Sequence, residues 1–150
     1  NFARVTVNRA AGNPDFKTVT PEMMWGPMNG PYNRYNDALL GAEKLRGTRL
    51  YISSGTGLAG RPDQVSYLMG IGAPQAAAQL GAGVLQVEGG VIEAAMNACT
   101  HDLMVKMRAN DVEVTHAELR NVGTHSWASW RDDLGLSYEK VFKKALGLEQ

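Results

Sequence analysis

A helical repeat between two strand-like segments constrains the fold of this chain more than any other feature. From Val91 to Asn110, apolar side chains recur every three or four residues, which is the stripe of an amphipathic helix. The β-like segment Thr48 to Ser53 precedes it, and Asp111 to Leu119, where apolar and polar residues alternate, follows it. Because strands joined through a helix run parallel, this order predicts an α/β fold of parallel strands with covering helices. The stripe consists of Ile92, Met96, Cys99, Leu103 and Met107.

Shorter elements are predicted before the first of these strands. Arg4 to Val7 is β-like, whereas Asn8 to Asn36 is rich in Gly, Pro and Asn, so we expect that stretch to be irregular. Asp37 to Leu45 is predicted to form a short helix, with Asp37 as its N-cap.

Further helices are predicted in the middle and at the end of the chain. Residues 61 to 90 are rich in Gly, Ala and Gln and predict one weak helix, around Ala76 to Leu80. Two terminal helices are expected, from about Ser126 to Leu134 and from Tyr138 to Leu146.

Composition narrows the class of protein. With 150 residues, 44% hydrophobic and 20% charged, the chain has room for one core and is too short for two ordinary domains. Because Lys+Arg 15 balance Asp+Glu 15, no net field favours nucleic acid or an anionic membrane. The uncharged stretch Val65 to Gln86 holds Pro74, glycines and glutamines, so we expect no integral membrane span.

His125 is the first candidate for a catalytic role. It lies in the loop after the strand that ends at Leu119, and ligands and catalytic groups of parallel sheets gather at the carboxyl ends of the strands. The alternative is a surface or helix-capping histidine. His101 and His116 are expected to be structural. No His or Cys pair has metal-ligand spacing, so we expect neither a zinc site nor another cofactor.

A histidine that acts as general base needs an orienting acid and a nucleophile. In α/β-hydrolase folds the chain order is Ser, then Asp or Glu, then His, with the serine in a G-x-S-x-G turn, which this chain lacks. Asp63 follows the strand that ends at Ser53, and Glu93 lies in the first turn of the long predicted helix. The helix dipole favours an ionised Glu93 by about 0.3–1 kcal/mol, which is too little to decide between the two acids.

Four motifs occur in an order that resembles a known family. They are M-W-G-P at Met24 to Pro27, R-Y-N-D at Arg34 to Asp37, T-R-L-Y-I-S-S-G-T-G from Thr48, and G-T-H-S-W-A-S-W from Gly123. Together they resemble the mycolyltransferases of the antigen 85 complex and their relatives in mycolate-bearing cell envelopes. Two departures are the longer stretch from Leu58 to Gly90 and Ser54, where those proteins often carry a cysteine.

The resemblance implies a fold and a pair of catalytic residues. Residues 1–150 would form a partial α/β-hydrolase domain, the C-terminal half of the fold, carrying the triad acid Glu93 and the histidine His125. Asp63 becomes the runner-up, and its replacement is expected to affect turnover little. The serine and the first strands would belong to an N-terminal half, the expected partner, so we expect one strand edge and some helix faces to be uncovered.

The resemblance also implies a reaction, mycolyl transfer between trehalose esters such as trehalose monomycolate, in a secreted enzyme of the cell envelope. A serine from the other half would attack the ester, while His125 moves the proton and Glu93 holds the imidazole. Trp127, with Ser126, would line the sugar site, although Trp127 is also consistent with a packed core residue. Trp25 is expected to be structural. The stretch from Val65 to Gln86 either covers a long alkyl chain or is a buried helix.

Two other functions remain compatible with the sequence. A carboxylesterase of the same fold would share Glu93 and His125 but transfer the acyl group to water. A non-catalytic binding module would keep the fold without the serine. Cys99, the single cysteine, is either a buried thiol on the apolar stripe or, as the extracellular setting implies, the partner of a cysteine in the N-terminal half.

Overall fold

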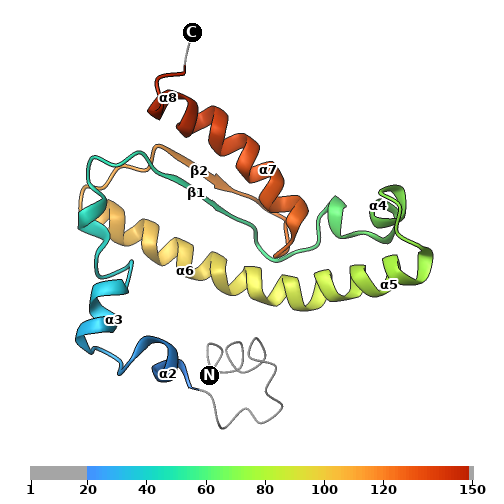
Figure 1. The fold of residues 1–150 in the computed structure, drawn as a ribbon, viewed down its shortest axis with the longest axis horizontal. Coiled ribbons are helices and arrows are strands. Elements are labelled where there is room, and N and C mark those ends of the chain that lie inside the picture. The colour runs from blue at the N-terminus through green and yellow to red at the C-terminus, as the bar shows by residue number, and fades with distance from the viewer. Residues whose placement is uncertain (1–19, 149–150) are drawn as a thin grey trace. The chain divides into compact units, whose positions relative to one another are not determined.

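The computed structural model describes residues 20–148, and Figure 1 draws their helices and strands as a ribbon. The chain divides into two compact units, Asn1–Lys44 and Leu45–Gln150. The predicted strand from Arg4 to Val7 lies outside the described residues. The described part is mixed α/β and mostly helical, as the sequence predicts in outline.

From residue 20 on, the first unit holds two short helices, α2 (Pro21–Trp25) and α3 (Pro31–Asn36). The expectation of irregular structure is therefore wrong for this part of the stretch from Asn8 to Asn36. Each helix begins with a proline, whose fixed φ suits the first helical position. Proline has no N–H, and none is needed there because an N–H at that position has no acceptor within the helix. Gly26, with φ 72°, ends α2. Glycine and proline thus delimit helices here instead of preventing them.

The helix predicted from Asp37 to Leu45 is reduced to a 3-10 turn, η1 (Ala42–Leu45). Asp37 nevertheless acts as a cap, because its Oδ1 accepts the backbone N–H groups of Leu39 at 2.8 Å and Leu40 at 3.2 Å. Those bonds stabilise a turn that does not continue as an α-helix.

The second unit contains a parallel pair of strands, β1 (Tyr51–Ser54) and β2 (His116–Leu119). Their register pairs Tyr51 with His116 and Ser54 with Leu119. The prediction of parallel strands is confirmed, and these are the two strands of the described part of the chain. In Figure 1 the strands lie between helix α6 (Gly90–Ala109) and helix α7 (Trp127–Ser137), so helices cover both faces.

Strand β2 is shorter than the alternating pattern from Asp111 to Leu119 predicts. The reason is the end of α6, where Asp111 takes a left-handed φ of 53°. Its N–H donates to the Arg108 carbonyl at 3.2 Å and the Val112 N–H donates to the Met107 carbonyl at 3.0 Å, which is a Schellman cap. Val112 is buried and takes part in this cap, so its place in the alternating apolar pattern reflects the helix end and not strand pairing.

The stretch from 61 to 90 is far more helical than the single weak helix predicted around Ala76 to Leu80. It forms the 3-10 turn η2 (Arg61–Asp63), α4 (Val65–Gly70), α5 (Gln75–Val84) and the π-helical turn η3 (Leu85–Gly89). Helix α5 continues through η3 directly into α6, as Figure 1 shows. The consecutive alanines and glutamines are good helix formers, which explains why interspersed glycines do not interrupt the helix.

Helix α6 is confirmed, but most of its predicted apolar stripe is not buried. Met107 is buried, whereas Met96 and Cys99 are exposed. The face that meets the strands carries polar groups at its first turns, where Asn97 Nδ2 donates to the Ser54 hydroxyl at 3.2 Å. The buried-thiol interpretation of Cys99 is therefore wrong. Exposed apolar side chains of this helix include Val91, Met96 and Val105.

The two predicted terminal helices form one continuous element. Helix α7 passes through a π-helical turn, η4 (Tyr138–Phe142), into α8 (Lys143–Ala145). Among the described residues, no helix has the length and apolarity needed to cross a membrane. The apolar residues buried in the second unit are Ala78, Ala82, Met107, Val112 and Val141.

Candidate active site

His125 and Glu93 meet at the carboxyl ends of the two strands. His125 lies in the loop between β2 and α7, and Glu93 lies in the first turn of α6, 32 positions earlier. The His125 Nδ1 is 3.1 Å from Glu93 Oε2, with 38% of the histidine side chain and 14% of the glutamate side chain exposed. Because a carboxylate only accepts hydrogen bonds, Nδ1 of His125 carries the hydrogen and donates it to Glu93 Oε2, which leaves Nε2 of the neutral imidazole as the acceptor.

Glu93 is held by the strand on the other side. The backbone N–H of Gly55, the residue after β1, donates to Glu93 Oε1 at 2.8 Å. The carboxylate therefore joins the residue after β1 to the loop after β2, one oxygen for each. Side chains that are hydrogen-bonded at both oxygens have little freedom to rotate, which suits a group that orients an imidazole.

The backbone of His125 is fixed independently of its side chain. Its N–H donates to the carbonyl of Gly89 at 3.1 Å, and Gly89 is the last residue of the π-helical turn. A π-helical turn inside an α-helix often marks a functional site, because it displaces one turn of backbone. Gly90 and Gly57 approach closely beside this turn, since a Cβ on Gly90 would lie 2.7 Å from the Gly57 carbonyl oxygen. The close approach of loop and helix thus depends on glycine.

One tryptophan packs on the histidine ring, and a second tryptophan packs on the first. Trp130 meets His125 edge-on, with ring centroids 4.7 Å apart, and Trp127 in turn meets Trp130 edge-on at 5.0 Å. Trp127 is 81% exposed, so the packed-core alternative is wrong for this residue. Ser126 is buried, and its hydroxyl lies 3.3 Å from that of Ser129. Of the two residues predicted to bind substrate, Trp127 offers the larger surface.

A mostly apolar cavity of about 620 Å³ opens beside this pair of tryptophans. The stretch from Val65 to Gln86 contributes one wall, from α4 and the π-helical turn, and α7 contributes the other. Helix α4 has no buried residue, so the buried-helix alternative fails for it. The lining residues of the cavity include Pro62, Leu85, Trp127 and Trp130.

Asp63, the other candidate acid, does not contact His125. It is 1% exposed, and its two oxygens accept hydrogen bonds from the Gly60 N–H at 2.8 Å and from the Thr124 hydroxyl at 2.6 Å. The structure therefore brings His125 to Glu93 and not to Asp63. His101 and His116 lie elsewhere, His101 on the exposed side of α6 and His116 stacked on Tyr51.

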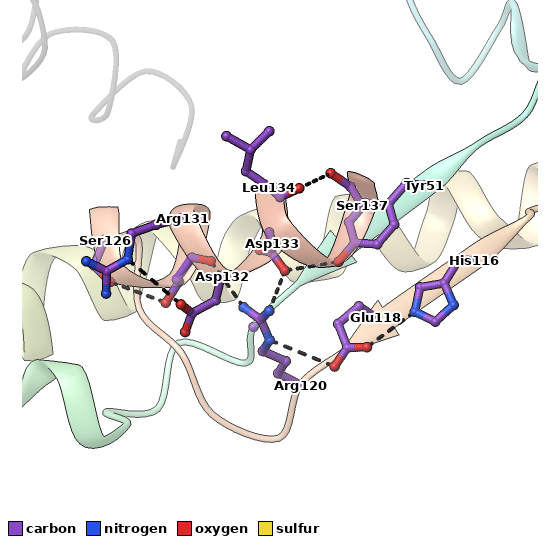
Figure 2. A network of polar contacts seen from close by, with 12 residues as sticks. Tyr51, His116, Glu118, Arg120, Ser126, Arg131, Asp132, Asp133, Leu134 and Ser137 are labelled. Carbon is purple, nitrogen blue, oxygen red and sulfur yellow. Dashed lines mark hydrogen bonds and ion pairs between the residues drawn. The ribbon is translucent and has the colours of Figure 1, made fainter. Parts of the chain in front are cut away.

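A polar network that the sequence did not reveal fastens α7 to both strands, and Figure 2 shows it. Arg120, which follows β2, pairs with Asp133 of α7 at 2.5 Å, and the Tyr51 hydroxyl of β1 donates to the same carboxylate at 3.2 Å. Burial, and then the negative charge of Asp133, raises the pKa of Tyr51 to about 12. Because the partners lie up to 82 positions apart, no local pattern could have found them.

Within residues 20–148, no three His, Cys, Asp or Glu side chains gather as a metal ion would require. No model of a known protein family matches the chain, and no curated protein matches it.

Proposed function

We propose that this chain supplies the histidine and the acid of a serine acyltransferase, and that it acts as the C-terminal half of an α/β-hydrolase domain. The contact between His125 Nδ1 and Glu93 Oε2, at 3.1 Å, carries the proposal. It is the contact by which a triad acid fixes the tautomer of its histidine and stabilises the imidazolium. Both residues lie at the carboxyl ends of parallel strands, where this class of fold carries its catalytic groups.

The nucleophile is proposed to come from a separate N-terminal half. Among the described residues, no side chain hydrogen-bonds to His125 Nε2, the atom that would accept the serine proton. One edge of β1 pairs with β2, and the described residues supply no strand for its other edge. Exposed apolar residues on α6, Val91 and Val105 among them, are consistent with a face that a partner covers.

The reaction proposed for the assembled enzyme is acyl transfer. His125 Nε2 takes the proton of the serine hydroxyl as its oxygen attacks the ester carbonyl, and the bond to the leaving sugar oxygen breaks as that oxygen receives the proton. A second sugar hydroxyl then attacks the acyl-enzyme, His125 takes its proton, and the serine recovers it. Glu93 stays ionised throughout and stabilises the transient imidazolium.

The substrate proposed is a trehalose ester of a long-chain acid, such as trehalose monomycolate. Trp127 presents an exposed indole face, which suits the C–H face of a sugar, and the mostly apolar cavity between α4 and α7 suits an alkyl chain. These features agree with the resemblance to envelope mycolyltransferases, which extends the proposal to a secreted enzyme of the cell envelope.

The test is an assay of the complete enzyme, meaning this chain together with the serine-bearing half, with and without trehalose. Acyl transfer to trehalose that is abolished by His125→Ala supports the proposal. Release of the free acid at the same rate with and without trehalose identifies a carboxylesterase instead. If the complete enzyme has no turnover with either acceptor, the chain is part of a binding module.

A further inference from the structure

Asp63 is a buried carboxylate that the proposed reaction does not use. It is 1% exposed, and a buried charge is costly unless it is fully hydrogen-bonded. Its Oδ2 accepts the Gly60 N–H at 2.8 Å, and its Oδ1 accepts the Thr124 hydroxyl at 2.6 Å. Its backbone carbonyl accepts the Gln86 side-chain amide at 2.8 Å. Three separate segments therefore meet at this one residue.

These contacts close a ring of hydrogen bonds around the backbone of His125. Thr124, which Asp63 holds, is buried and directly precedes His125. The His125 N–H donates to the carbonyl of Gly89, and Gly89 shares the π-helical turn Leu85–Gly89 with Gln86, which returns to Asp63. This circle of hydrogen bonds fixes the position of the His125 backbone, whereas Glu93 fixes the orientation of the imidazole.

We propose that Asp63 is a positioning residue. Through Thr124 it holds the backbone of His125 in the position from which the imidazole can transfer protons to and from the serine. The inference rests on the function proposed above. It replaces the expectation that Asp63 has little effect on turnover. Catalytic groups need placement within a fraction of an ångström, and displacement by about 1 Å costs roughly 10²-fold in rate.

Asp63 also connects the histidine loop to the wall of the apolar cavity. Pro62, its neighbour in η2, lines the cavity, as does Leu85 at the start of the π-helical turn. A rearrangement of the Asp63 ring of contacts would therefore move the histidine and this wall together.

The experiment uses four single variants of the complete enzyme and one double variant, which combines Thr124→Val with Asp63→Asn. Thr124→Val removes the hydroxyl at nearly constant volume, and Thr124→Ser keeps it. Asp63→Asn keeps the shape but removes the charge, and Asp102→Asn, an exposed aspartate on α6, is the matched control. Thermal unfolding of each variant shows whether it folds, and because Thr124→Val addresses the same contact, the test does not depend on the folding of Asp63→Asn.

We expect Thr124→Val and Asp63→Asn each to lower kcat roughly 10- to 100-fold while KM changes less than about threefold. Thr124→Ser should recover kcat to within about threefold, and Asp102→Asn should match the unmodified enzyme. The double variant should be no slower than the slower single variant, because both changes break one contact.

Three results would overturn the inference. They are a normal kcat in folded Thr124→Val, a Thr124→Ser variant as slow as Thr124→Val, and fully multiplicative losses in the double variant. A normal kcat in His125→Ala would instead overturn the proposed function itself. The two failures are therefore distinguishable.

Discussion

The backbone N–H of Gly55 donates to Oε1 of Glu93 at 2.8 Å, so the end of strand β1 holds the carboxylate whose other oxygen contacts His125. A glutamate hydrogen-bonded at only one oxygen could rotate away from the imidazole, whereas Glu93 is held by the loops that follow both strands. Orientation of the histidine therefore depends on the parallel pairing of β1 and β2 as well as on α6.

This chain by itself should hydrolyse or transfer no ester, because the nucleophile that we propose for His125 to activate belongs to the other half. The measurement is turnover of a chromogenic ester by the purified chain, compared with buffer that contains free imidazole. Adding the serine-bearing half should restore activity. Turnover by the separated chain above the imidazole background would contradict the two-half enzyme.

In the complete enzyme, His125→Ala should lower kcat on the order of 10⁴-fold or more. Glu93→Gln should cost somewhat less, since the amide keeps the shape but cannot stabilise the imidazolium as a carboxylate does. His101→Ala, on the exposed side of α6, is the matched histidine control and should match the unmodified enzyme. An unchanged kcat in Glu93→Gln would remove Glu93 from the proposed triad.

Trp127→Ala should weaken use of the sugar acceptor without destabilising the protein. Its side chain is 81% exposed, so its removal should leave the thermal midpoint nearly unchanged. We expect KM for the acceptor to rise roughly three- to tenfold, equivalent to about 0.6–1.4 kcal/mol. Transfer to water should change less. Equal losses for both acceptors would indicate that Trp127 contacts the acyl donor or only supports Trp130.

Stability at high pH should depend on Tyr51. Its pKa is raised from 10.0 to about 12 in the folded protein by burial and then by Asp133. A folded pKa above the unfolded value means that the stabilisation is complete below pH 10 and is lost as the pH rises through about 12.

Tyr51→Phe should flatten this alkaline loss of stability, which denaturant unfolding between pH 9 and 12 would measure. Asp133→Asn should lower the Tyr51 pKa, because it removes the negative charge that helps to raise it. Ultraviolet titration of the tyrosinates provides that second measurement. A Tyr51→Phe variant whose alkaline unfolding matches the unmodified protein would contradict the assignment.

Cys99 should form a disulfide with a cysteine of the serine-bearing half. Its thiol is exposed on α6, as an intermolecular bond requires, and the proposed extracellular setting favours oxidation. Such a bond would stabilise the assembly by roughly 2–4 kcal/mol. Mass spectrometry of non-reduced complete enzyme would detect the linked peptides, and a freely alkylated Cys99 in fresh material would rule the bond out.

Sequence periodicity by itself determined the elements that repeat locally. The apolar period from Val91 to Asn110 predicted α6 within one residue at each end, and the order of strand, helix and strand predicted the parallel pair. The motif G-T-H-S-W and the position of His125 after a strand also identified the histidine that meets Glu93. These features depend on contacts close in sequence or on chain order, which a sequence records directly.

Only the tertiary structure decided which groups meet and which are covered. The apolar period predicted where α6 begins and ends but not which of its faces is buried. Glu93 and Asn97 hydrogen-bond to the end of β1, whereas Cys99 is exposed. Asp63 looked like a competing acid because it follows a strand, yet its partner is the Thr124 hydroxyl, 61 positions away. Hydrogen bonds between side chains so distant in sequence leave no periodic trace, since only the packing of the folded chain sets their distances.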